Sequence, residues 1–116
     1  MNEDLELSVA QAAEFATWFQ ALADPTRMRI LNLLATANRE LTVTEIVARL
    51  GLKQSTTSHH LKILHDVGFA LRRREGTQMF YYVNANCLER FPTAADMVMG
   101  RFRTPSDKTG PGWLAS

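Results

Sequence analysis

The sequence predicts a mainly helical α+β domain with winged helix-turn-helix architecture, containing about five to six helices and one two-stranded β-hairpin. Two observations predict it. A short capped helix beginning at Thr42 is joined through Gly51 to a second helix over residues 54–67, and two short helices joined by a glycine-containing turn form a helix-turn-helix. A hairpin centred on Glu75-Gly76 follows directly, in the position of a wing.

The N-terminal third of the chain predicts two helices. Ser8 suits the N-cap of the first, and the apolar residues of this helix cover more than one stripe. A helix this apolar in a small domain often packs against a second chain. Asp24-Pro25 then suits the N-cap and first position of a second helix, which ends near residues 37–38. The apolar residues of the first helix are Ala12, Ala13, Phe15, Ala16, Trp18, Phe19, Leu22 and Ala23.

Local signals predict each boundary of the helix-turn-helix. Thr42 and Glu45 match a capping box, in which each side chain bonds the backbone N–H of the other residue. Gly51 is suited to end this helix in the left-handed conformation. The next helix is expected from residue 54 or 55 to residue 67, and Gly68 closes it.

The hairpin is predicted from two segments, residues 69–74 and 77–83, that are rich in aromatic and β-branched side chains. Such segments favour strands. Glu75-Gly76 separates them, and glycine readily takes the positive φ of a tight hairpin turn.

After the hairpin, Asn84 suits the N-cap of a helix over about residues 85–91. We expect Pro92 to interrupt this helix before it resumes over residues 93–102, because proline lacks the N–H that a helix interior needs. The expected organisation is a flexible acidic N-terminus (1–7), one winged helix-turn-helix domain (8–103) and a disordered tail (104–116).

Length and composition place the chain in a broad class. It has 116 residues, of which 46% are apolar and 22% charged, which is typical of one ordered globular domain. No apolar run approaches the ~18 residues of a membrane span, and the acidic first residues do not resemble a secretory signal. The single cysteine, Cys87, excludes an internal disulfide and fits a reducing compartment. We therefore expect a cytoplasmic protein with no membrane partner.

The net charge of +1 does not by itself indicate a nucleic-acid partner, but the distribution of charge does. Residues 1–14 carry four acidic and no basic residues, whereas residues 53–78 carry five basic residues against two acidic ones. A locally basic face on an otherwise neutral protein is the electrostatic feature expected of a DNA-binding domain.

The second helix of the helix-turn-helix carries small polar side chains at positions that we expect to face outward. Such side chains let a helix approach the floor of the major groove, where Gln can bond adenine and Ser or Thr can bond bases or phosphates. Alone, this segment could equally be a solvated polar helix. With the turn and hairpin around it, it predicts DNA contacts from Gln54, Ser55, Thr56, Thr57, Ser58, His59 and Lys62.

The hairpin supplies a second set of candidate DNA contacts, namely Arg72, Arg73, Arg74 and Gln78. Arginines at a hairpin can lie along phosphates or enter the minor groove. Because strand side chains alternate, Arg73 must point away from Arg72 and Arg74. The alternative is that these charges only protect a strand edge from pairing with another chain.

Several motifs together resemble the ArsR/SmtB family of bacterial winged helix-turn-helix regulators. They are ADPTRMRIL (residues 23–31), SHHLKIL (58–64), GF (68–69), RREGT (73–77) and YY (81–82). The resemblance covers about residues 15–83. It implies a homodimer built from the first and last helices, with the helix over residues 54–67 reading a palindromic operator in duplex DNA and the hairpin acting as the wing. It also implies that a metal ion or another chemical signal alters DNA affinity.

The metal sites of this family do not carry over to the matching positions. Arsenic- and cadmium-type members place Cys-Val-Cys where this chain has Thr42-Val43-Thr44, and threonine hydroxyls are poor ligands for soft metals. Zinc- and cobalt-type members place Asp, His and Glu on the last helix, where residues 84–103 offer Glu89 and Asp96 but no histidine. A metal response would therefore need a non-standard site.

Few other ligands remain. His65 and Asp66 could hold a divalent transition metal with carboxylates from a partner chain, or His65 could simply be a surface residue favoured by the helix C-terminus. His60 matches a family position where we expect a structural histidine. Cys87 lies near a helix start, where its pKa could be lowered for redox sensing, or it is a half-buried structural residue.

The sequence thus predicts a homodimeric, sequence-specific DNA-binding regulator that responds to a metal ion or another small signal. Two alternatives stay open: a ligand-independent regulator controlled by its abundance or by a co-regulator protein, and a winged-helix protein-interaction module. No nucleophile–base pair, phosphate-binding glycine loop or paired carboxylates are recognisable, so we expect no enzymatic activity.

Overall fold

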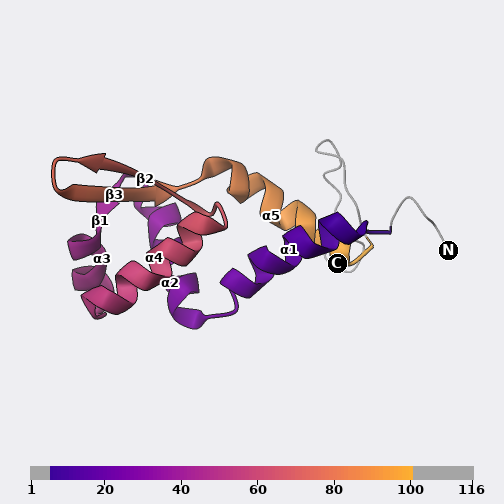
Figure 1. Cartoon of the computed structure of the whole chain (residues 1–116), viewed down its shortest axis with the longest axis horizontal. Coiled ribbons are helices and arrows are strands. Elements are labelled where there is room, and N and C mark those ends of the chain that lie inside the picture. The colour runs from indigo at the N-terminus through magenta and orange to yellow at the C-terminus, as the bar shows by residue number, and fades with distance from the viewer. Residues whose placement is uncertain (1–5, 101–116) are drawn as a thin grey trace, which may run out of the picture.

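The computed structural model describes residues 6–100, which form five helices and a three-stranded sheet (Figure 1). This confirms the mainly helical winged fold. The acidic residues 1–5 and the tail predicted over 104–116 lie outside the described residues. In chain order the elements are α1 (Val9–Ala21), α2 (Pro25–Ala37), β1 (Leu41–Thr42), α3 (Val43–Leu50), α4 (Gln54–Asp66), β2 (Ala70–Glu75), β3 (Gln78–Val83) and α5 (Ala85–Val98).

The capping residues predicted from the sequence start four of the helices. Ser8 caps α1 and Asp24 caps α2, where its carboxylate accepts two backbone N–H bonds. Thr42 forms the expected capping box with Glu45 at α3, and Asn84 caps α5. These assignments were predictable because a cap depends only on residues within one helical turn of it.

The sheet contains one strand that the sequence did not predict. The strand order is β1-β3-β2, with both pairs antiparallel. β1 is only two residues long, and it pairs with Tyr81 and Phe80 of β3. The hairpin turn also differs by one residue: Glu75 is the last residue of β2, and the turn is Gly76-Thr77, with Gly76 at φ +62°. A two-residue strand has no periodicity to recognise, and it forms only because β3 already presents a free edge.

The last helix corrects a second expectation. α5 runs without a break through Pro92, although the sequence predicted an interruption there. The lost backbone hydrogen bond is offset by packing on both sides of the proline. The Phe91 ring lies 5.0 Å from that of Phe19 and 5.5 Å from that of Phe69, measured between centroids, and Ala94 is buried.

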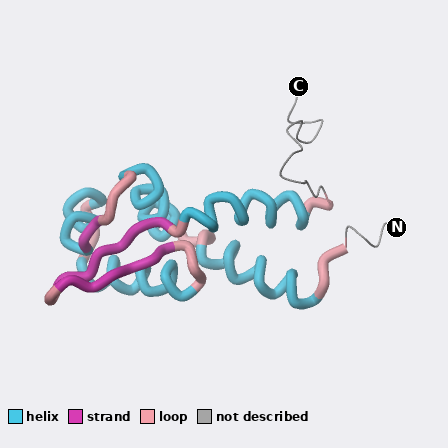
Figure 2. The backbone as a smooth tube through the Cα atoms, turned by 90° about the horizontal axis from the view of Figure 1, so that it is seen from above, coloured by secondary structure: helices cyan, strands magenta, loops and turns pink. Residues whose placement is uncertain are grey.

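The molecule has two parts, a body and an arm (Figures 1 and 2). In the body, α2, α3 and α4 pack beneath the sheet around a fully buried core that includes Ile30, Ile46 and Leu61. The arm consists of α1 and α5, which lie side by side and extend away from the sheet. Within residues 6–100, no helix is long and apolar enough to cross a membrane.

Candidate nucleic-acid interface

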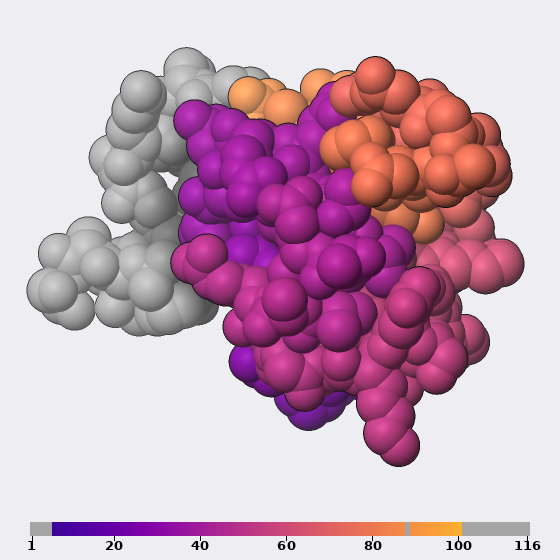
Figure 3. Space-filling view, turned by 90° about the vertical axis from the view of Figure 1, so that its left-hand side faces the viewer, coloured from indigo at the N-terminus to yellow at the C-terminus, as the bar shows by residue number. Residues whose placement is uncertain are grey.

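The N-terminal half of α4 is exposed on the side of the molecule shown in Figure 3, which also carries the hairpin. Six of the seven candidate side chains on this helix are exposed, as predicted: Gln54, Ser55, Thr56, Ser58, His59 and Lys62. Lys62 forms an ion pair with Asp66 one turn later, with 2.7 Å between Nζ and Oδ2, and this contact lowers the pKa of the Asp66 carboxyl.

Thr57 corrects the prediction, because its side chain faces the core and not the solvent. It is fully buried, and its hydroxyl donates a hydrogen bond of 2.8 Å to the backbone carbonyl of Lys53. The reason is helical periodicity: Thr57, Leu61 and Leu64 lie at i, i+4 and i+7, on the single face that packs into the body. Thr57 therefore cannot contact DNA from this position.

The start of α4 differs from the starts of the other helices in the described chain. Lys53 occupies the N-cap, and its side chain makes no capping hydrogen bond, whereas α1, α2, α3 and α5 all have side-chain caps. The first N–H groups of α4 are thus left for an outside acceptor. Together with the helix dipole, they favour an anion such as a DNA phosphate at this end.

His60 lies behind the exposed face and connects α4 to the rest of the body. It is 9% exposed, and its Nδ1 lies 3.3 Å from Nη1 of Arg27 on α2. The Nε of Arg27 donates a 2.6 Å hydrogen bond to the carbonyl of Ala21 at the end of α1. Because a guanidinium can only donate, Nδ1 of His60 is the acceptor in this contact. The expected structural role of His60 agrees with this position, and the role of Arg27 was not predicted.

The hairpin divides its four candidate side chains between two faces. Arg72 pairs across the ladder with Tyr81, and Arg74 with Met79, so these two arginines share the sheet face whose inner part packs against the body. Arg73 pairs with Phe80 and therefore lies on the opposite, outer face. Gln78 is directly opposite Glu75 and shares this outer face. All four side chains are exposed.

The residues that were weighed as metal ligands do not assemble into a site. Within residues 6–100, no three His, Cys, Asp or Glu side chains are grouped so that they could hold a metal ion. The hydroxyl of Thr42 caps α3, and Thr44 is exposed. His65 and Asp66 lie near each other, with 3.7 Å between Nδ1 and Oδ1, but they supply only two groups.

Cys87 has a structural contact instead of a reactive environment. Its Sγ donates a 3.0 Å hydrogen bond to the carbonyl of Gly68, which closes α4. Burial raises the pKa of the Cys87 thiol, although the nearby Arg90 lowers it somewhat. Of the two interpretations of Cys87, the lowered pKa at a helix start is not supported, because desolvation outweighs the neighbouring charge. The half-buried structural residue agrees with its burial and its hydrogen bond.

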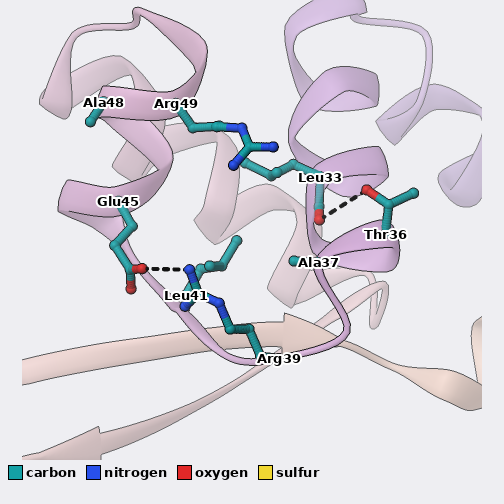
Figure 4. Close-up of a pocket in the computed structure, with 8 residues that line it drawn as sticks. All are labelled: Leu33, Thr36, Ala37, Arg39, Leu41, Glu45, Ala48 and Arg49. Carbon is teal, nitrogen blue, oxygen red and sulfur yellow. Dashed lines mark hydrogen bonds and ion pairs between the residues drawn. The ribbon is translucent and has the colours of Figure 1, made fainter.

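A groove between α2, β1 and α3, which the sequence did not predict, opens beside the helix-turn-helix (Figure 4). It has a volume of about 630 Å³, and its lining includes the apolar residues Leu33 and Leu41. An ion pair between Nη2 of Arg39 and Oε2 of Glu45, 2.9 Å long, crosses one end. Arg39 is also the main cause of the lowered pKa of Glu45, so the groove is tied to the capping box of α3.

Comparison with known proteins gives matches over this same region. The family model described as "Bacterial regulatory protein, arsR family" matches residues 24–70. An uncharacterized HTH-type transcriptional regulator of Methanocaldococcus jannaschii is 48% identical over 65 residues, which make up 56% of this chain and 72% of that protein. The arsenical resistance operon repressor of Staphylococcus xylosus is 31% identical over 85 residues, 73% of this chain and 80% of the relative.

The fold also matches solved structures. A winged helix-turn-helix DNA-binding domain of Mycobacterium bovis, described as homodimeric and as a possible ArsR-family regulator, aligns with a TM-score of 0.62 and 30% identity. The alignment covers 84% of this chain and 95% of that domain. Some relatives are longer than the matched region: the match spans only 59% of the SmtB homolog of Synechocystis, a transcriptional repressor.

Proposed function

The chain belongs to the ArsR family of DNA-binding transcriptional regulators, which are not enzymes, and we propose that it binds a palindromic operator as a homodimer. The observation that carries this proposal is the exposed row of small polar side chains at the uncapped start of α4. In this proposal the row enters the major groove, with Ser58 and His59 facing base edges and the N–H groups of α4 facing a phosphate.

The hairpin provides the second contact. Arg72 and Arg74 project from the face that continues toward the body, and neither forms an ion pair within the described residues. Two unpaired guanidinium groups on a protruding ribbon are suited to backbone phosphates or to a narrow minor groove. Their placement beside α4 favours a regulator over a protein-interaction module.

The arm supplies the dimer contact in this proposal. Its far end exposes three large apolar side chains, Val9, Val98 and Met99, which are 90%, 49% and 64% exposed. Burying them against a second copy would remove an apolar patch from water. A two-fold dimer then presents two copies of α4, which fits an operator with two half-sites related by the same symmetry.

The effector is a separate question. Some relatives are named as arsenical and cadmium resistance regulators, but the described residues of this chain do not fit a metal site of three or more ligands. A metal ion at His65 and Asp66 would need further ligands from a second chain. This arrangement favours control by abundance or by a partner protein over control by a metal ion. A titration of the purified dimer with Zn²⁺, with DNA affinity followed throughout, decides between a metal sensor with a non-standard site and a regulator with no metal input.

A paired substitution tests the DNA-binding face. Ser58→Ala with His59→Ala should weaken binding to a duplex selected by the wild-type protein by about 10- to 100-fold, given the usual cost of losing base contacts. The matched control is Asn32→Ala with Thr36→Ala, two exposed polar residues on α2 that should leave affinity unchanged. Wild-type affinity in the α4 variant would overturn the assignment of this face.

A further inference from the structure

Arg73 differs from its two neighbours in the position of its side chain. It lies directly across the ladder from Phe80, which in turn pairs with Thr42 of β1. Partners across a ladder share a sheet face, so Arg73, Phe80 and Thr42 form one row across all three strands on the outer face. Glu40, two residues before Thr42, lies next to the end of this row.

The guanidinium of Arg73 lies over the Phe80 ring, 4.7 Å from its centroid, and reaches Glu40 beyond it. Its Nε donates to both carboxylate oxygens of Glu40 at 2.9 and 2.8 Å, and Nη2 lies 2.8 Å from Oε2. The third nitrogen, Nη1, donates to Glu75 at 2.9 Å. All three guanidinium nitrogens are therefore engaged within the protein. These carboxylates, with Glu40 first, raise the pKa of Arg73 further above its already high value.

The two ends of this contact belong to different parts of the fold. Glu40 directly precedes β1, whose Thr42 caps α3, so it is attached to the frame of the helix-turn-helix. Arg73 lies in the outer strand of the protruding hairpin. The contact therefore connects the hairpin to the helix-turn-helix across the whole width of the sheet.

The charge balance of the two faces differs as well. On the outer face, the single positive charge of Arg73 is surrounded by Glu40 and Glu75, so this cluster carries a net negative charge that repels phosphate. On the other face, Arg72 and Arg74 have no acidic partner among the described ion pairs.

We propose that Arg73 makes no DNA contact and is a positioning residue that fixes the hairpin on Glu40, so that Arg72 and Arg74 are held in line with α4. The proposal rests on the proposed DNA-binding function. It separates three neighbouring arginines into two that neutralise phosphates and one that sets their direction. A hairpin that is already ordered loses less conformational entropy when the complex forms, so more of the contact energy contributes to affinity.

The salt dependence of DNA affinity tests this division directly. Each arginine that neutralises a phosphate adds about one to the slope of log affinity against log salt concentration. Arg72→Gln and Arg74→Gln should each reduce that slope by about one. Arg73→Gln should change the slope by much less than one and weaken binding by roughly 2- to 5-fold, the size expected for loss of exposed ion pairs. The probe is a duplex selected by the wild-type full chain.

For Glu40→Gln, the proposal and simple charge repulsion predict opposite changes in DNA affinity. On charge alone, removing a negative charge near DNA should strengthen binding, whereas the proposal expects the same loss as Arg73→Gln. The double variant should lose no more than either single variant, because both remove one contact. Thermal unfolding of each variant checks that the fold is retained, as expected for exposed side chains.

Two results would overturn the proposal: a slope reduced by about one in Arg73→Gln, or unchanged or tighter binding in Glu40→Gln. Failure of the proposed function looks different. In that case the wild-type protein shows no salt-dependent binding at all, and substitutions of Arg72 and Arg74 have no effect either.

Discussion

At the scale of single residues, two adjacent positions of α4 lie on different sides of the helix, one buried and one exposed. Thr57 points into the core and bonds the Lys53 carbonyl, while Ser58 next to it is exposed. Both are small hydroxyl residues in a polar segment, so composition alone could not assign them. The distinction comes from Leu61 and Leu64, whose burial fixes the rotation of the helix about its axis.

Thr57→Ala should therefore change stability and not DNA recognition. Removing the buried hydroxyl and methyl group should lower the free energy of unfolding by about 1–2 kcal/mol, from the lost hydrogen bond and the small cavity. Chemical denaturation measures this, and DNA affinity per folded molecule should match the wild-type value. A large loss of affinity at unchanged stability would return Thr57 to the DNA-binding set.

Cys87 and Arg73 show the limit of residue-level prediction. From the sequence, Cys87 could be a reactive thiol at a helix start or a half-buried structural residue, and its burial and its hydrogen bond to the Gly68 carbonyl favour the structural role. The alternation of strand side chains predicted that Arg73 points away from its neighbours. This alternation could not predict that Glu40, 33 positions earlier in the chain, lies on the same side as Arg73 and binds its guanidinium. Such contacts depend on the assembled fold.

At the scale of elements, the helix-turn-helix was predictable because its signals are local. The capping residues and Gly51 occupy the expected positions, and α4 agrees with its predicted span to within one residue. β1 and the unbroken α5 were not predictable. β1 exists only through its pairing with β3, and α5 passes Pro92 because Phe91 packs against the ring of Phe19 on α1 and the ring of Phe69 just before β2.

The start of α3 should be sensitive to acid through Glu45. Hydrogen bonds from Arg39, and then from the Thr42 backbone, lower the pKa of this carboxyl from its ordinary value of 4.5. A lowered folded-state pKa means that the ionised group stabilises the fold above the unfolded-state pKa, and that this contribution is lost as pH falls through the folded-state value.

We therefore expect Glu45→Gln to be less stable than the wild type at pH 7, and the difference to shrink as the pH falls from about 5 toward 3. Glutamine can still complete the capping box, so the substitution isolates the contribution of charge. Urea denaturation at a series of pH values measures the difference. A difference that grows on acidification would contradict the assigned role of Arg39.

At the scale of the whole molecule, the arm and the body are separate, so in the proposed function dimerisation and DNA binding involve different ends of the protein. α1 and α5 extend from the body and expose Val98 and Met99, while the α4 face and the hairpin lie on the body (Figure 1). In the proposed dimer, the arm sets the distance and angle between two copies of α4, and therefore the spacing of the half-sites.

Charges placed on the arm should break the dimer without touching the DNA-binding face. Val98→Asp with Met99→Asp should shift the protein from dimer to monomer in sedimentation experiments, and should lower operator affinity because only one half-site can then be held. Leu71→Asp, at an exposed hairpin position, is the matched control and should remain dimeric. A dimer that survives the arm substitutions would place the interface elsewhere.

The central claim is that this chain reads a symmetric DNA site through α4. Selection from a library of random duplexes by the purified full chain tests it most directly. We expect enrichment of an inverted repeat whose half-sites lie about one helical turn of DNA or a multiple of it apart, and loss of that enrichment in the variant with Ser58→Ala and His59→Ala. Enrichment of no sequence, of a single unpaired half-site, or of the same repeat by the variant would contradict it.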